Sequence, residues 1–146
     1  MKAKLIKIVF SIWPPFVGAG IRVKYIAADF TEAIVALNLH WYNINYVKTH
    51  FGGSLYAMTD PFYMLMLMHL LGKDYIIWDK NGSIDYISPA RGTVTAHFRI
   101  DDKQVAEIKE RTIAGEAFLP EYTVDINNEQ GDVIAKVTKR LHIRRK

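Results

Sequence analysis

A glycine pair followed by an acidic residue is the part of the sequence whose residue types and spacing could support chemistry. Gly52 and Gly53 precede the most apolar stretch of the chain, and Asp60 comes shortly after them. Glycine lets the backbone approach a ligand closely, and the first N–H groups of a helix have no partner within it. Those free donors, supported by the helix dipole, can bind the oxyanion that develops when a carbonyl group is attacked.

The spacing of Gly53 and Asp60 raises a difficulty for a site built from one chain. In a straight helix the two residues would lie about 10 Å apart along the axis. One carbonyl group cannot contact both, but a partner subunit could supply one of them. A structural role for Asp60 also stays open, because Asp followed by Pro61 is typical of a helix N-cap with proline in the first helical position.

Other polar residues near this stretch have a structural and a functional interpretation. Asn45 is of a type common in turns, although an amide could also orient a reacting group. Arg91, on a loop next to Gly92, could bind a phosphate through two hydrogen bonds or could simply be solvated. The histidines have no spacing typical of a metal site, and a carboxylate-rich loop is absent. We therefore predict that no metal is bound.

Composition limits the classes of function. The chain has 146 residues, a net charge of +4 and no cysteine. This excludes disulfides and thiolate nucleophiles, and it fits a reducing cytoplasm. The small positive surplus suits a phosphate-bearing small molecule better than a nucleic acid. No apolar stretch reaches the roughly 20 residues that span a bilayer, so we expect no membrane insertion.

The N-terminus has two interpretations. Three lysines followed by the apolar residues 8–13 resemble the start of a signal peptide. The lysines interrupt the apolar residues, however, and Pro14 and Pro15 end them early. The alternative is a short helix over residues 1–13, docked on the domain through one face made of Leu5, Val9 and Ile12.

The rest of the chain alternates between strand patterns and one helical stretch. Residues 62–71 are apolar apart from His69, which predicts a helix buried on all sides that ends at Gly72. Asp101 with Gln104 three residues later predicts a second, short helix. Apolar residues alternate with polar ones in the remaining segments. The predicted strands are 21–25, 33–41, 75–78, 84–87, 93–100, 122–127 and 133–143, with turns at Asp29–Glu32, Asn81-Gly82 and Asn128–Asp132.

These elements predict one α+β domain over residues 1–146. An antiparallel sheet wrapped around a long central helix buries that helix with few elements, because each strand offers one apolar face. A sandwich with a helix on one face is the alternative. No repeat or domain linker divides the chain.

Several segments resemble a known family. The sequence resembles the hotdog-fold thioesterases of the phenylacetate-pathway type, and more closely the group of that superfamily called domain-of-unknown-function 4442 or tetrameric acyl-CoA thioesterases. The resemblance covers nearly the whole chain and rests on Pro15-Phe16, Thr49–Ala57, Asp60–Phe62, Gly72–Tyr75 and Pro89–Val94. It implies a hotdog fold, with short accessory helices beside the central one, and a homo-oligomer, dimer or tetramer.

The resemblance also implies roles for individual residues. Gly53 would be the oxyanion donor, Asp60, contributed by a partner subunit, the general base or nucleophile, and Asn45 the residue that orients the water or the thioester. The implied substrate is an acyl-CoA or acyl-carrier-protein thioester, hydrolysed without a cofactor. The residues implied to bind it are Arg91, Gly52, His50 and Ser54.

Two positions depart from the family pattern. Phe51 stands where many relatives carry histidine, and Lys48 stands where relatives usually carry glycine. A hotdog hydratase or dehydratase normally needs that histidine, so Phe51 counts against such an activity. A non-catalytic acyl-CoA-binding module on the same fold remains the alternative to a thioesterase, since the fold alone does not decide between them.

Overall fold

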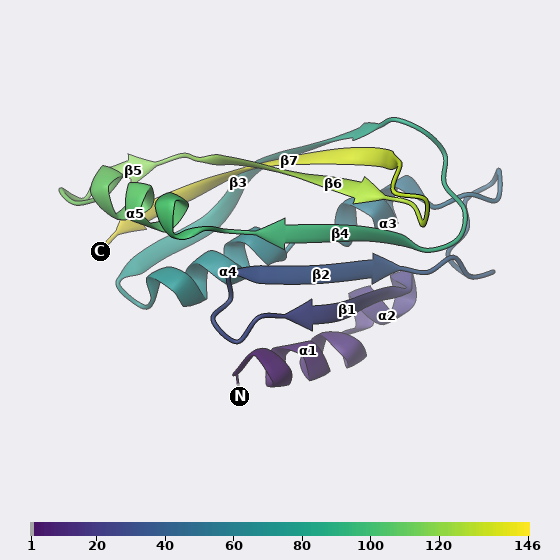
Figure 1. Cartoon of the computed structure of the whole chain (residues 1–146), viewed down its shortest axis with the longest axis horizontal. Helices are drawn as coiled ribbons and strands as arrows, with labels where there is room; N and C mark the ends of the chain where they lie inside the picture. The colour runs from purple at the N-terminus through teal and green to yellow at the C-terminus, as the bar shows by residue number, and fades with distance from the viewer. Residues whose placement is uncertain (1) are drawn as a thin grey trace.

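The structure is a computed structural model that describes residues 2–146. Figure 1 shows an antiparallel sheet with helices behind it and along one edge. The elements in chain order are α1 (Lys2–Ile12), α2 (Pro14–Ala19), β1 (Ile21–Ile26), β2 (Glu32–Leu37), α3 (Gly52–Ala57), α4 (Phe62–Leu71), β3 (Tyr75–Tyr86), β4 (Val94–Arg99), α5 (Asp102–Arg111), β5 (Ala117–Phe118), β6 (Glu121–Asn127) and β7 (Val133–Arg145).

The strands form one sheet in the order β1-β2-β4-β6-β7-β3, and the short β5 pairs with β7. Every pairing is antiparallel, as the alternating patterns predicted. Side chains on one face pack against the central helix: Phe98 of β4 lies 5.0 Å from Phe62 of α4, measured between ring centroids. The predicted α+β architecture, with an antiparallel sheet around a buried helix, is confirmed.

The central helical segment is divided into two helices, whereas the sequence pattern predicted one. After α3 the chain makes tight turns, in which Thr59 N–H donates to Tyr56 O and Asp60 N–H to Ala57 O. Pro61 follows and has no N–H to continue the helical ladder. The chain therefore resumes as α4 at Phe62, and Asp60 lies in the connecting turn rather than within a helix.

Strand β3 corrects a second prediction. Residues 75–86 form one continuous strand paired with β7, so Asn81 and Gly82 do not form a turn. The register shifts between Asp79 and Asn81, which makes Lys80 a bulge residue. A bulge changes which face the following residues occupy. As a result, both Asp79 and Gly82 lie opposite inward-facing residues of β7.

Strand β2 is shorter than predicted, because a side chain organises the loop after it. The strand ends at Leu37 instead of Trp41. The side chain of Asn43 accepts a hydrogen bond from His40 N–H (2.7 Å) and donates to the carbonyls of Asn38 and Ala19. These contacts replace strand pairing, and Trp41 is left 86% exposed.

Helix α1 lies along the edge of the sheet beside β1 (Figure 1). Its contact face differs from the predicted one, because Leu5, Val9 and Ile12 are exposed. Phe10 instead stacks on Phe16 at 5.2 Å and approaches Phe62 at 5.8 Å between ring centroids. The aromatic cluster buries more apolar area than the smaller side chains would, and this determines the orientation of the helix.

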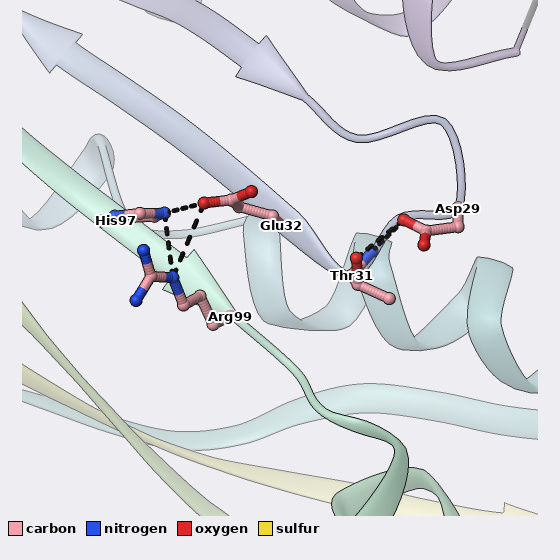
Figure 2. Close-up of polar contacts among 5 residues, drawn as sticks. All are labelled: Asp29, Thr31, Glu32, His97 and Arg99. Atoms are coloured by element: carbon pink, nitrogen blue, oxygen red, sulfur yellow. Dashed lines mark hydrogen bonds and ion pairs between the residues drawn. The ribbon is translucent and has the colours of Figure 1, made fainter.

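Ion pairs and hydrogen bonds occupy the outer face of the sheet and the first turn. In Figure 2 the side chains of Glu32, His97 and Arg99 point toward one another from the neighbouring strands β2 and β4. Asp29 accepts hydrogen bonds from Thr31 N–H and Oγ1–H at the predicted turn, and these bonds lower the pKa of the Asp29 carboxyl. The β1–β2 hairpin is thereby confirmed.

The last third of the chain follows the predictions closely. Asp101 accepts a hydrogen bond from Gln104 N–H, and the Gln104 side chain accepts one from Asp101 N–H, which completes a capping box for α5. Strands β6 and β7 then pair as a hairpin across residues 128–132. This hairpin places β7 next to β3, where its inward-facing side chains contact the α3–α4 turn.

Candidate functional site

A cavity of about 560 Å³ lies where helix α3 begins. Two loops meet there at the same end of the sheet, one between β2 and α3 and the other between β3 and β4 (Figure 1). The wall is formed by both loops and by the first turn of α3. The lining residues are Asn45, Val47, Thr49, His50, Phe51, Gly52, Gly53, Leu55, Tyr86, Ile87, Ser88, Pro89 and Ala90.

The glycine pair opens α3, as the sequence predicted, and aromatic rings cover both glycines. A Cβ at Gly52 would lie 2.8 Å from Tyr86 Oη, and one at Gly53 would lie 2.7 Å from Phe51 Cε1. Neither position has room for a side chain without movement of a ring. Within residues 2–146 the N–H groups of both glycines donate no hydrogen bond, so two free donors lie at the cavity wall.

Asn45 organises the loop that carries the glycine pair. Its amide Nδ2 donates to Thr49 Oγ1 (2.8 Å) and to the His50 carbonyl (3.2 Å). Its Oδ1 accepts from Val47 N–H and Thr49 N–H at 3.1 and 2.9 Å. Both hydrogens of the Asn45 amide are donated to groups of the same loop. These contacts fit the turn role that the sequence offered for Asn45.

His50 joins the two loops of the cavity. Its backbone N–H donates to Ala90 O, and its ring Nε2 lies 2.7 Å from Gly92 O. A carbonyl oxygen only accepts, so Nε2 carries the proton and Nδ1 is the basic nitrogen. Nδ1 is buried without a hydrogen-bond partner among residues 2–146. Burial lowers the pKa of His50, and the bond to Gly92 offsets part of that effect, so the ring is neutral at physiological pH.

Two other predicted binding residues lie beside the cavity instead of lining it. Ser54 is buried in the first turn of α3, where its N–H donates to Phe51 O. Arg91 is exposed in the loop between β3 and β4, and within the described chain it forms no ion pair. Its guanidinium is therefore available to an anion from solvent.

Asp60 lies beyond the far end of α3, and it does not line the cavity of its own chain. Its Oδ1 is 2.9 Å from Lys139 Nζ, and its side chain is 56% exposed. The capping interpretation is wrong in this structure, because the N-cap residue of α4 is Pro61 and no side chain caps that helix. Of the predicted site residues, Gly52, Gly53, His50 and Asn45 line the cavity and Ser54 and Arg91 lie beside it. Asp60 lies away from the cavity and forms an ion pair with the buried Lys139.

The partners of Asp60 were not predicted. Lys139 Nζ also lies 3.1 Å from Asp79 Oδ2 and 4.9 Å from the centre of the Tyr56 ring. The sequence does indicate that Lys139 is unusual, because in the alternating pattern of β7 it shares the inward face with the apolar residues Val137 and Leu141. A lysine at such a position must be paired, since burying an isolated charge is costly.

Neither a metal site nor a membrane-crossing helix is found among residues 2–146. No group of three or more His, Cys, Asp or Glu side chains is arranged to hold a metal ion there. In the same part of the chain, none of the helices has the length and apolar character needed to cross a membrane.

Solved structures with the same fold come from several bacteria. A Pseudomonas aeruginosa protein described as a probable thioesterase matches with a TM-score of 0.80 at 17% identity, over 98% of this chain and 95% of that chain. A thioesterase from Haemophilus influenzae matches with a TM-score of 0.73 at 13% identity, over 99% and 92%. A mutant of the phenylacetic acid degradation protein PaaI from Thermus thermophilus matches with a TM-score of 0.62 at 21% identity, over 88% and 97%.

At these identities the likeness establishes the fold, and the predicted hotdog fold is confirmed. No curated protein matches the chain in sequence. Residues 2–143 match the family described as Domain of unknown function (DUF4442), in agreement with the resemblance found in the sequence. The chain therefore belongs to the DUF4442 family.

Proposed function

We propose that the protein hydrolyses acyl thioesters, with acyl-CoA or an acyl-carrier protein as the substrate. The observation that supports this most directly is the pair of free backbone N–H groups, on Gly52 and Gly53, at the wall of a mainly apolar cavity. An apolar cavity suits an acyl chain, and free donors at a helix start suit the oxyanion of an attacked carbonyl. The structural relatives described as thioesterases support the same reaction.

In the proposed reaction Gly53 N–H donates to the thioester carbonyl oxygen. Asp60 accepts a proton from water as the water oxygen bonds to the carbonyl carbon. The C–S bond then breaks, and the leaving thiolate takes up the proton from Asp60, which returns the carboxylate to its starting form. Asn45 contributes by holding the loop that orients the bound thioester, and no metal or redox cofactor takes part.

The separation of Asp60 from the cavity favours a site shared between subunits. Asp60 lies outside the cavity of its own chain, so the carboxylate that serves this cavity comes from a second copy. Among residues 2–146, strand β3 is the last strand of the sheet and pairs with no strand on its outer edge, which is therefore open to a second copy. We therefore propose a homo-oligomer, either a dimer or a tetramer, as the active form.

The proposed substrate contacts extend outward from the cavity. Gly52 and His50 line the cavity beside the reacting group, the buried Ser54 supports them from the first turn of α3, and the exposed Arg91 binds phosphates of the CoA moiety. Arg91→Ala should weaken acyl-CoA binding and reduce its salt dependence, with kcat changed less. We place the reaction in the cytoplasm, where acyl-CoA is available and a protein without cysteine needs no oxidising environment.

A panel of acyl-CoAs with a free-thiol readout tests the proposal, and the protein contributes no thiol background because it has no cysteine. Asp60→Asn is the decisive variant. An amide cannot accept the proton, so turnover should fall on the order of 10²-fold, while acyl-CoA affinity and the melting temperature change little. Near-wild-type hydrolysis by Asp60→Asn would remove Asp60 from the mechanism.

The alternative function is a non-catalytic acyl-CoA-binding module on the same fold. The observation that favours it is the position of Asp60, which pairs with Lys139 instead of facing the cavity. Acyl-CoA binding without hydrolysis of any member of the panel would support the binding module and exclude the thioesterase.

A further inference from the structure

A buried lysine of strand β7, Lys139, contacts the candidate catalytic carboxylate of Asp60 in the α3–α4 turn. Lys139 faces inward from β7, and its side chain is 2% exposed. Its Nζ donates to Asp60 Oδ1 at 2.9 Å and to Asp79 Oδ2 at 3.1 Å. Within residues 2–146 the ion pair uses Oδ1 of Asp60 and Oδ2 accepts no hydrogen bond, and the side chain as a whole is more than half exposed.

The charges of the three side chains favour a permanently protonated lysine. Burial alone would lower the pKa of Lys139, but the hydrogen bonds and charges of Asp60 and Asp79 raise it above its ordinary value. Two carboxylates and one ammonium sum to −1, so the cluster keeps one excess negative charge. Asp60 carries the exposed share of that charge, because the second oxygen of Asp79 is buried and has no partner within residues 2–146.

The surroundings hold the ammonium in a fixed position. The Tyr56 ring lies against Nζ at 4.9 Å, as in a cation–π contact. Gly82, opposite Lys139 on β3, provides the space, since a Cβ there would lie 2.1 Å from Tyr56 Oη and 3.3 Å from Lys139 Cδ. The bulge at Lys80 brings Asp79 and Gly82 to the same face of the strand.

We propose that Lys139 is a positioning residue for Asp60, a role that rests on the thioesterase function proposed above. Lys139 holds one carboxylate oxygen so that the other faces the attacking water, and Asp79 keeps the ammonium in place. Lys139 contacts neither the substrate nor the reacting atoms.

Kinetics of a charge-matched variant test this role. Lys139→Met with Asp79→Asn removes the cation and its second partner together, so that no unpaired charge is left buried. We expect kcat to fall about 10-fold or more, with KM changed much less, because the water-activating oxygen is no longer held in place.

Two further variants separate positioning from a purely structural role. Lys139→Arg keeps the charge and a hydrogen-bond donor at this position and should retain most of kcat. Lys136→Met removes an outward-facing lysine of the same strand, paired with Asp125, and should leave kcat and KM unchanged. If the double variant keeps the wild-type kcat, or if Lys139→Arg loses as much kcat as the double variant, the positioning role is wrong. A wild-type protein inactive on every thioester would instead overturn the proposed function, and this inference with it.

Discussion

Strand β7 carries lysines on both faces, and the two environments differ sharply. On the outer face Lys136 lies 3.5 Å from Asp125, its cross-strand neighbour, with both side chains half exposed. On the inner face Lys139 is almost fully buried between Asp60 and Asp79. An exposed ion pair gains little Coulomb energy in water and restricts two long side chains, so it contributes little to the free energy of unfolding. A buried pair cannot lose one member without leaving a charge away from water.

This difference shows which charged side chains contribute strongly to the stability of the fold. The outer pairs can be exchanged with little effect, whereas Lys139 connects the α3–α4 turn, β3 and β7. Four substitutions test this difference, and they are given in order of decreasing effect.

Replacing Lys139 by Met alone should destabilise the fold strongly. Asp60 and Asp79 would be left close together without a cation, so we expect a loss of about 2–3 kcal/mol, below the usual cost of breaking a buried pair because Asp60 is partly solvated. Lys136→Met is the matched control on the same strand and should cost less than about 0.5 kcal/mol. Urea unfolding of both variants measures the difference, and equal losses would contradict the comparison.

Adding a methyl group at Gly82 tests the space around the buried lysine. The new Cβ would collide with Tyr56 Oη, so Gly82→Ala should cost about 1–2 kcal/mol through overpacking. Gly18→Ala provides the control, because a Cβ at that position of α2 meets nothing within 4 Å. It should be neutral or slightly stabilising in the same unfolding measurement. A neutral Gly82→Ala would show that Tyr56 is not held beneath Lys139.

His50 offers a buried titratable group without an ion partner. Because its pKa is lowered in the folded state, the unfolded chain takes up a proton first as the pH falls below about 6.5. The free energy of unfolding should therefore decrease between pH 7 and the lowered pKa. In His50→Gln this part of the decrease should disappear, as measured by urea unfolding at pH 7.5 and pH 5. Parallel profiles for the two proteins would contradict a buried, neutral His50.

The smallest effect is expected at the outer pair of Glu121 with Arg140. Glu121 Oε1 accepts from Arg140 Nη2 at 2.7 Å and from Nε at 3.2 Å. Since both side chains are exposed, Glu121→Gln should cost about 0.3–1 kcal/mol at low salt, and less at high salt because ions screen the pair. Thermal unfolding at two ionic strengths measures this, and a loss that is independent of salt would argue against an electrostatic origin.

The sequence predicts the elements well where local pattern determines them. Alternating residues identified the strands, the capping box at Asp101 identified α5, and the apolar stretch identified α4. Asn81-Gly82 is typical of a hairpin turn, but pairing with β7 along the whole of β3 overrides that local preference. The face of α1 was also mispredicted, because its orientation depends on the contacts of Phe10 with Phe16 in the next helix and with Phe62 in α4. The pattern of residues within α1 does not indicate these contacts.

The candidate site was predictable only in part. The glycine pair, His50 and Asn45 lie close together in sequence, and the structure brings them to one cavity. The contacts of Asp60 depend on Asp79 and Lys139, which belong to other elements. No local pattern relates such distant residues, although the inward phase of Lys139 marks it as a charge that needs a partner.

The place of β3 in the sheet has a consequence for how the chain folds during synthesis. Within residues 2–146 its sheet partner is β7, which follows it only after β4, α5, β5 and β6 in chain order. The ion pair of Asp60 likewise cannot form until Lys139, 79 positions further along the chain, has been synthesised. Until β7 has left the ribosome, this twelve-residue strand has no sheet partner among residues 2–146, and contacts over such long loops form slowly. A nascent chain arrested before β7 would therefore expose β3 to aggregation, and a chaperone that shields extended strands would matter most at that stage.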